Sequence, residues 1–371
     1  MLKLNKLNYL VFLALSAPAL ALADTGNITV YGVLHADLES VKNDKPLANN
    51  ASSLNRVVSN ASLLGFKGSE NLGDDLSAIY QLEAEFDLTN TAGTPFAKTR
   101  NSNVGLKGNF GTAFYGNWDT PYKLTNAKVN LFGYTHIAAS TDITGRVGIS
   151  DGNATFNTRQ KNVIQYWTPN YNGFQAKLAY APDNAKKSTV AVATGGDKSV
   201  WSMSAAYEND MLFGAYGYET HKDALAGVGS TVSLTDSANR LVGAYKFKDG
   251  QVGLVYERLS VATAVTSTTT SSRNGWELSG KHKFGASNVG ASYARAGDLG
   301  GVANTGANQY SLRYGYNFSK RTEVYGFYTQ LSNDAAASYN FSAGTVVTST
   351  AGTAGLGAKL SGLGLGLIHT F

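Results

Sequence analysis

The stretch that decides the fold runs from Leu76 to Leu88 and reads LSAIYQLEAEFDL. A β-strand places alternate side chains on opposite faces, and this stretch alternates between apolar and mostly polar residues. One face would carry Leu76, Ala78, Tyr80, Leu82, Ala84, Phe86 and Leu88, and the other Ser77, Ile79, Gln81, Glu83, Glu85 and Asp87. The stretch therefore predicts a strand with one apolar and one polar face.

The same alternation appears between Ile28 and Glu39 and recurs to the last residue, Phe371. The connections between such stretches alternate in length. Seven are short: Glu70–Asp74, Asn109–Gly111, Asn170–Gly173, Asn209–Asp210, Asp249–Gly250, Gly285–Ala286 and Ser319–Arg321. Eight are long and polar: 41–55, 91–98, 119–158, 183–198, 222–236, 263–272, 298–306 and 333–354. This organisation predicts sixteen strands.

Sixteen alternating strands could form a soluble sandwich or propeller, or a barrel with its apolar face toward lipid. Short and long connections alternate in outer-membrane barrels. Aromatic residues gather beside the short connections, as an interfacial girdle requires: Phe110, Tyr171, Phe174, Phe247, Phe284 and Phe318. The chain also ends on an apolar strand face made of Leu363, Leu365, Leu367, His369 and Phe371. We therefore predict an all-β fold, a 16-stranded antiparallel transmembrane β-barrel.

The first residues have the pattern of a secretory signal peptide. Lys3 and Lys6 precede an apolar run from Leu10 to Ala23, which ends in small residues suited to cleavage. The other interpretation, a core helix or membrane anchor, is disfavoured because a spanning helix needs roughly 20 apolar residues. We expect residues 1–23 to be removed and residues 24–371 to form the barrel domain.

Composition and motifs argue against several other functions. The chain has no Cys, its five histidines are scattered without metal-ligand spacing, and no cofactor is expected. A net charge of +5 over 371 residues does not indicate nucleic-acid binding. Residues 148–152 read GISDG and match a hydrolase nucleophile motif, but no helix-forming stretch follows as that motif requires. We expect no enzymatic activity.

Several blocks of sequence resemble a known family. They are Gly65–Gly73 (GFKGSENLG), Ala78–Glu83 (AIYQLE), Val104–Gly108 (VGLKG), Tyr166–Pro169 (YWTP), Tyr316–Thr322 (YNFSKRT) and the terminal His369-Thr370-Phe371. Their order and spacing resemble the trimeric general porins of Gram-negative bacteria, in the neisserial and betaproteobacterial branch. The resemblance covers essentially the whole mature chain.

The resemblance implies a homotrimer in the bacterial outer membrane, in contact with its lipid. It also implies that the third loop, here about Asp119–Thr158, folds into the lumen and narrows it. A connection this long is usually functional or disordered. The family often has Arg where Leu63 and Gln165 stand, on the basic wall of the constriction. Strong anion selectivity is therefore in doubt.

The expected activity is passive diffusion of ions and small hydrophilic solutes through a water-filled channel, where charged side chains bias entry. Candidate pore-lining or constriction residues on the strands are Lys67, Glu83, Glu85, Asp87, Arg159 and Lys161. In the third loop the candidates are Asp142 and Arg146. Two alternatives stay open at this point: a substrate-specific outer-membrane channel, and a surface β-protein that binds a partner through its loops.

Overall fold

A computed structural model describes nine stretches of the chain: 28–47, 51–89, 96–132, 135–147, 156–182, 198–223, 235–262, 270–341 and 354–371. The expected signal peptide (1–23) and the GISDG motif (148–152) lie outside the described residues. Among the described residues, no helix is long and apolar enough to span a membrane.

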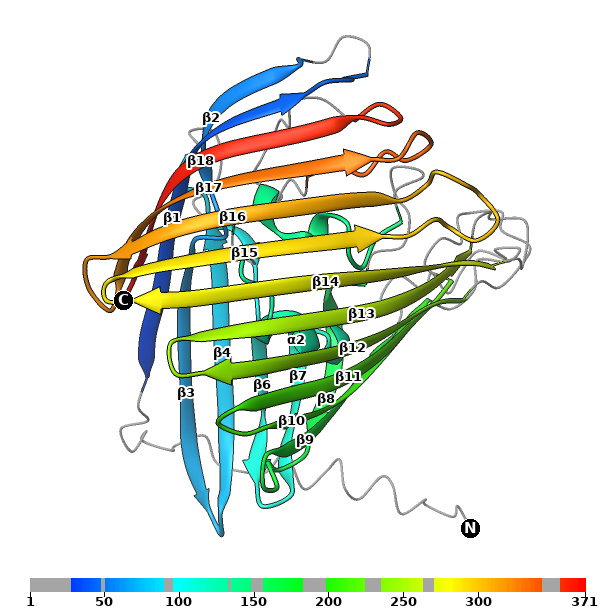
Figure 1. Ribbon diagram of the computed structural model, residues 1–371. Helices are drawn as coiled ribbons and strands as arrows, with labels where there is room; N and C mark the ends of the chain where they lie inside the picture. Colours follow the sequence, from blue (N-terminus) through cyan, green and yellow to red (C-terminus); the bar gives the residue numbers. More distant parts are fainter. Residues whose placement is uncertain are drawn as a thin grey trace.

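Eighteen strand segments form one closed antiparallel sheet (Figure 1). They are β1 (Thr29–Asn43), β2 (Ser53–Ser59), β3 (Leu63–Gly73), β4 (Leu76–Phe86), β5 (Phe96–Thr99), β6 (Ser102–Gly108), β7 (Gly111–Asp119), β8 (Arg159–Trp167), β9 (Phe174–Pro182), β10 (Ser199–Glu208), β11 (Leu212–Lys222), β12 (Thr235–Phe247), β13 (Gly250–Ala262), β14 (Thr270–Phe284), β15 (Ser287–Ala296), β16 (Ala307–Asn317), β17 (Thr322–Asn333) and β18 (Lys359–Thr370). Successive barrel strands pair antiparallel from β1 through to β18, and β1 also pairs with β18, which closes the barrel.

Two of the sixteen barrel strands are each divided into two segments. β1 pairs with β2 through Ala36–Lys42 and with β3 through Thr29–Val33, so β2 and β3 occupy one strand position. β5 and β6 share one position in the same way, because both pair with β4. The prediction of a closed 16-stranded barrel is therefore confirmed.

The break between β2 and β3 has a local cause in polar side chains. Ala61 has a φ of 53°, in the left-handed region that a non-glycine residue rarely adopts. The amide of Asn60 donates to the His35 carbonyl at 2.9 Å, and the His35 amide donates to the Ser62 hydroxyl at 3.0 Å. The Ser62 hydroxyl thus takes the place of a ladder partner for the His35 backbone, and the strand is interrupted without opening the barrel.

The two faces of the strands separate as the alternation predicts. Leu82 is 61% exposed and Leu365 is 68% exposed on the outer surface, whereas Glu85 is buried on the inner side of β4. The girdle aromatics are also exposed: Phe110, Tyr171, Phe174, Phe247, Phe284 and Phe318. In water this surface would be unfavourable by about 25 cal/mol per Å² of apolar area, but it suits contact with acyl chains.

The barrel closes where the first strand, β1, meets the last strand, β18. Gly32 and Phe371 exchange both backbone hydrogen bonds at 3.1 Å, and the ladder continues from Val33–Thr370 to Asn43–Leu360. A Cβ on Gly32 would lie 2.3 Å from the Phe371 ring. Because Gly32 has no side chain, the Phe371 ring can pack over the junction between β1 and β18.

Strand β4 ends earlier than the alternation predicts. It stops at Phe86, and the Asp87 carboxylate accepts hydrogen bonds from the Thr89 amide at 2.8 Å and the Thr89 hydroxyl at 2.7 Å. Such a local side-chain turn competes with strand pairing. The strand prediction was therefore wrong for its last two residues, Asp87 and Leu88.

Candidate functional site

The described part of the third long connection, residues 120–132 and 135–147, lies inside the barrel. After β7 the chain forms helix α2 (Pro121–Thr125) and three short 3-10 turns at Asn126–Lys128, His136–Ala138 and Ser140–Asp142. Figure 1 shows α2 enclosed by the strands. We call residues 120–147 the inner segment. It lies against β10 to β12 and β15 to β17, and side-chain contacts extend this to β13, β14 and β18.

A buried ion cluster attaches both ends of the inner segment to the barrel wall. Glu257 on β13 lies 3.0 Å from Arg240 on β12 and 3.1 Å from Arg273 on β14, and all three side chains are fully buried. Its carboxylate also accepts a hydrogen bond from the Gly145 amide at 2.7 Å. The guanidinium of Arg240 lies 4.1 Å from the centre of the Tyr122 ring on α2. The wall and both ends of the segment therefore share one set of contacts.

The middle of the inner segment is attached by polar and apolar contacts together. Gln309 on β16 donates to the Ile137 carbonyl at 3.0 Å, and the Ser311 hydroxyl donates to the Ala138 carbonyl at 2.8 Å. Around these bonds the segment buries Phe132, Ile137 and Ile143 in a cluster with wall residues that include Phe327, Leu331 and Leu360. Apolar side chains thus occupy part of the inner face, and the segment fills this side of the lumen.

The other side of the lumen is bounded by β3, β4 and β6 to β9, and its carboxylates are mostly paired. Asp119 lies 2.7 Å from Lys123 and 3.2 Å from Arg159, and Glu85 lies 2.5 Å from Arg100. Burial lowers the pKa of the Lys123 ammonium, and the adjacent Asp119 opposes this shift. Lys123 is therefore held as part of an ion cluster.

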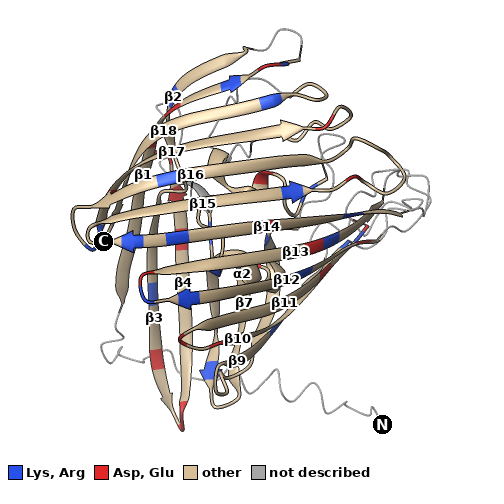
Figure 2. Ribbon diagram, viewed as in Figure 1, with Lys and Arg blue, Asp and Glu red and all other residues tan. Residues whose placement is uncertain are grey.

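Glu83 differs from these carboxylates because no basic side chain reaches it within the described residues. It accepts hydrogen bonds from the Tyr31 hydroxyl at 2.8 Å and the Asn101 amide at 3.1 Å. Lys67, opposite on β3, lies 5.0 Å from the centre of the Tyr31 ring. Figure 2 shows both signs of charge on β3 and β4. Glu83 and Lys67 thus bracket one tyrosine.

The remaining candidates from the sequence occupy different environments. Asp142 is buried beside Gln309, whose amide lies 3.4 Å from its carboxylate. Arg146 offers its backbone carbonyl to Arg273. Asp87 sits in the turn after β4. The structure therefore does not bring the eight candidates to one ring.

Arg159 and Lys161 lie at a β-bulge. The register between β7 and β8 shifts between Gly116 and Trp118, and Asn162 has a φ of 52°. A slip of one residue exchanges the two faces of a strand, so alternation counted from Gln165 does not carry through to Lys161. Lys161 is exposed, whereas Arg159 turns to Asp119 and Asn101.

A hollow of about 860 Å³ lies on this side of the lumen, near the short turns. Its inward side chains come from β3, β4 and β6 to β9 and include Lys67, Gln81, Asn103, Trp118, Trp167 and Gln175. Within the described residues, no Asp or Glu lines it. Neither tryptophan was named from the sequence as a pore-lining candidate. One signal was present, because Trp118 stands between two polar residues directly before the third loop.

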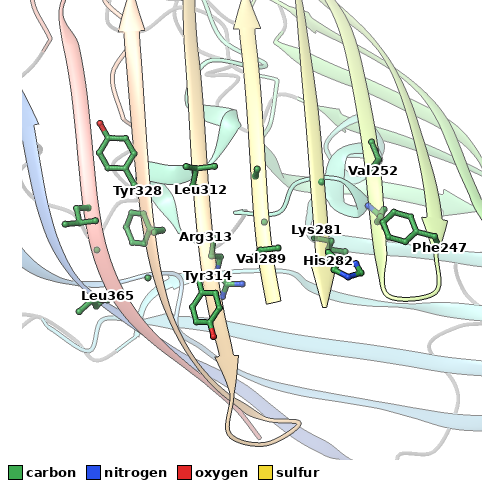
Figure 3. A pocket seen from close by; sticks show the side chains of 18 residues that line it. Phe247, Val252, Lys281, His282, Val289, Leu312, Arg313, Tyr314, Tyr328 and Leu365 are labelled. Atoms are coloured by element: carbon green, nitrogen blue, oxygen red, sulfur yellow. The ribbon is translucent and has the colours of Figure 1, made fainter. Parts of the chain in front are cut away.

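A second hollow belongs to the outer surface (Figure 3). Most of its lining comes from outward-facing residues of β13 to β18, among them Val252, Leu312 and Leu365. Four side chains of the inner face also border it: Gln251, Lys281, Arg313 and Phe327. The rings of Phe247, His282 and Tyr314 lie toward the short turns in this view. Because most of the lining side chains belong to the apolar outer face, this hollow faces lipid and lies outside the channel.

Comparison with known proteins is consistent over nearly the whole chain. Residues 10–336 match the family model described as Gram-negative porin. The chain is 28% identical over 376 residues to outer membrane porin protein 32 of Delftia acidovorans, which covers 98% of this chain and 99% of that protein. It is 28% identical over 334 residues to major outer membrane protein P.IB of Neisseria sicca, covering 84% of this chain and 90% of that protein.

A solved structure is similar as well. The anion-selective porin from Comamonas acidovorans superposes with a TM-score of 0.79 at 25% identity, covering 93% of this chain and 100% of that one. The fold of this chain therefore has a counterpart in a solved structure over nearly its whole length.

Proposed function

Because this chain belongs to the Gram-negative porin family, it is an outer-membrane channel for passive diffusion of small hydrophilic solutes, and we propose which part of its lumen they cross. The route runs between the inner segment and the wall formed by β3, β4 and β6 to β9. The opposite side is filled by the Glu257 cluster and the apolar cluster around Ile137. The family resemblance inferred from the sequence is confirmed.

We propose that this route prefers anions, and one observation carries the proposal. Lys67, Lys107 and Lys177 lie on the inward side of β3, β6 and β9, and none of them forms an ion pair with a described residue. Glu83 is the carboxylate of this wall that lacks a basic partner among those residues. A low-dielectric wall focuses the field of such unpaired charges on the passing ion. A relative of the same fold is named an anion-selective porin.

Among the candidates from the sequence, Lys67 is assigned the largest effect on selectivity, with Glu83 opposing it. Arg159 and Glu85 act mainly within their ion pairs. Asp142 and Arg146 are assigned to the attachment of the inner segment, and Asp87 and Lys161 to the edges of the lumen.

We also infer a homotrimer in contact with outer-membrane lipid, which catalyses no reaction and needs no cofactor. The family resemblance supports the trimer, and the apolar outer face supports the lipid contact. A band on unboiled gels that moves to a third of its apparent mass on heating would support this inference. Elution as a detergent-solubilised monomer would contradict it.

The proposed selectivity is tested in a planar bilayer with a tenfold KCl gradient. The wild-type reversal potential should have the sign of anion flow, and Lys67→Glu should move it toward cations. Lys320→Glu, on the short turn between β16 and β17, provides a control with the same charge change. Equal shifts in both variants, or none in Lys67→Glu, would remove Lys67 from the conducting path.

A further inference from the structure

The hollow on the open side of the lumen contains aromatic surface where a water-filled pore needs none. Trp118 and Trp167 are partly exposed there and pack edge to face against buried Phe114, with ring centres 5.1 Å and 5.3 Å apart. The other tryptophans, Trp201 and Trp276, are exposed on the outer face. Contact between indole surface and water is unfavourable by about 25 cal/mol per Å² of apolar area. A solute that covers the exposed part of these two rings would therefore be stabilised.

Phe114 fixes the two rings in place. It is only 1% exposed and lies behind both of them, and the indole nitrogen of Trp167 donates to the Gln165 side chain at 2.9 Å. The rings are therefore held before any solute arrives. Binding to a rigid aromatic surface loses little side-chain freedom, which favours affinity.

Cationic and amide groups surround the rings. Lys67 and Lys107 line the hollow. Lys177 is not part of this lining, but its ammonium lies 4.2 Å from the centre of the Trp167 ring, which is. Gln81, Asn103 and Gln175 add uncharged hydrogen-bonding groups. A solute placed here would meet a flat apolar surface and a positive charge together.

We propose that this hollow is a binding subsite for small aromatic carboxylates on their way through the pore. The ring of the solute stacks against Trp118 and Trp167, and its carboxylate pairs with Lys177 or Lys67. The assignment rests on the anion preference proposed above. Aliphatic carboxylates lack the flat face, neutral aromatics lack the charge, and organic cations would be repelled by the two lysines.

The test uses single channels of the mature protein, residues 24–371, in planar bilayers, with benzoate added to a KCl background. Millimolar benzoate should interrupt or reduce the current in a saturable way, whereas equal acetate or benzyl alcohol should not. Trp167→Leu and Trp118→Leu should each weaken the benzoate effect about tenfold, the size of one aromatic contact. Trp276→Leu, on the outer face, provides the matched control and should behave as wild type.

Two further measurements keep the outcomes separate. Lys177→Gln should also weaken the benzoate effect while the rings remain, which tests the subsite even if a tryptophan variant fails to fold. The reversal potential, measured in the same membranes, tests the anion preference alone. Anion preference without any benzoate effect overturns the subsite and leaves the proposed function standing. An equal effect of benzyl alcohol overturns the role of the carboxylate, and a cation-preferring channel overturns both proposals.

Discussion

Neutralising Glu257 should loosen the inner segment while the barrel stays intact. The carboxylate is fully buried between two guanidinium groups at 3.0 Å and 3.1 Å, and it accepts the Gly145 amide at 2.7 Å. Removing one partner of a buried ion pair costs about 3–5 kcal/mol because the remaining charge is left unpaired. Glu257→Gln retains the shape of the side chain and one acceptor, so we expect the lower end of this range.

A loss of about 3 kcal/mol reduces the ratio of attached to detached segment about a hundredfold, since about 1.4 kcal/mol corresponds to a factor of ten. The strand ladder does not depend on Glu257, so heat-modifiable mobility on gels should remain. Single-channel recordings should show more open-channel noise and excursions to higher conductance. Glu70→Gln, an exposed carboxylate on β3, provides the control. Quiet, wild-type conductance in Glu257→Gln would refute the view that this cluster holds the segment.

Three other predictions concern the barrel and its processing. Gly32→Ala should lower the yield of folded barrel, because the new Cβ would lie 2.8 Å from the Leu63 carbonyl oxygen, a backbone atom, as well as against the Phe371 ring, whereas Gly214→Ala, with nothing within 4 Å, should fold normally in the same refolding assay. Because the chain has no Cys, single cysteines report on one site each: a charged thiol reagent should label Gln81→Cys in intact membranes and leave Leu82→Cys and Leu365→Cys unlabelled. Mass spectrometry of the outer-membrane form should show a chain beginning at Asp24, and a retained residue 1–23 stretch would contradict the expected cleavage.

The barrel could be predicted from the sequence because its main signal repeats every two residues. Leu82 and Leu365 are exposed for the same reason that Glu85 is buried, and each hairpin repeats the rule. Local hydrogen bonds of polar residues interrupt this alternation at two places. The turn at Asp87 ends β4 early, and the contacts around Asn60 and Ser62 divide one strand into β2 and β3.

The site was less predictable because its contacts join residues far apart in the chain. No local pattern links Gly145 to Glu257 or Ile137 to Gln309, since each pair is more than a hundred positions apart. The alternation also fails at the bulge in β8. The face of the strand on which Lys161 lies therefore could not be predicted, because the sequence does not reveal the bulge. The residues that line the remaining passage follow from where the inner segment packs.

Charge pairing explains why counting charged residues on the strands does not give the selectivity of the channel. A carboxylate paired with a guanidinium, such as Glu85 with Arg100, presents almost no net field a few ångströms away, whatever its place on the strand. Asp119 has two basic neighbours, so that group carries one excess positive charge. Absence of Arg at Leu63 and Gln165 therefore weakens the basic wall without removing it, because Lys67 and Lys177 stay unpaired among the described residues. The sign of selectivity depends on which charges lack partners, and a substitution that breaks a pair should alter it as much as one that removes an unpaired lysine.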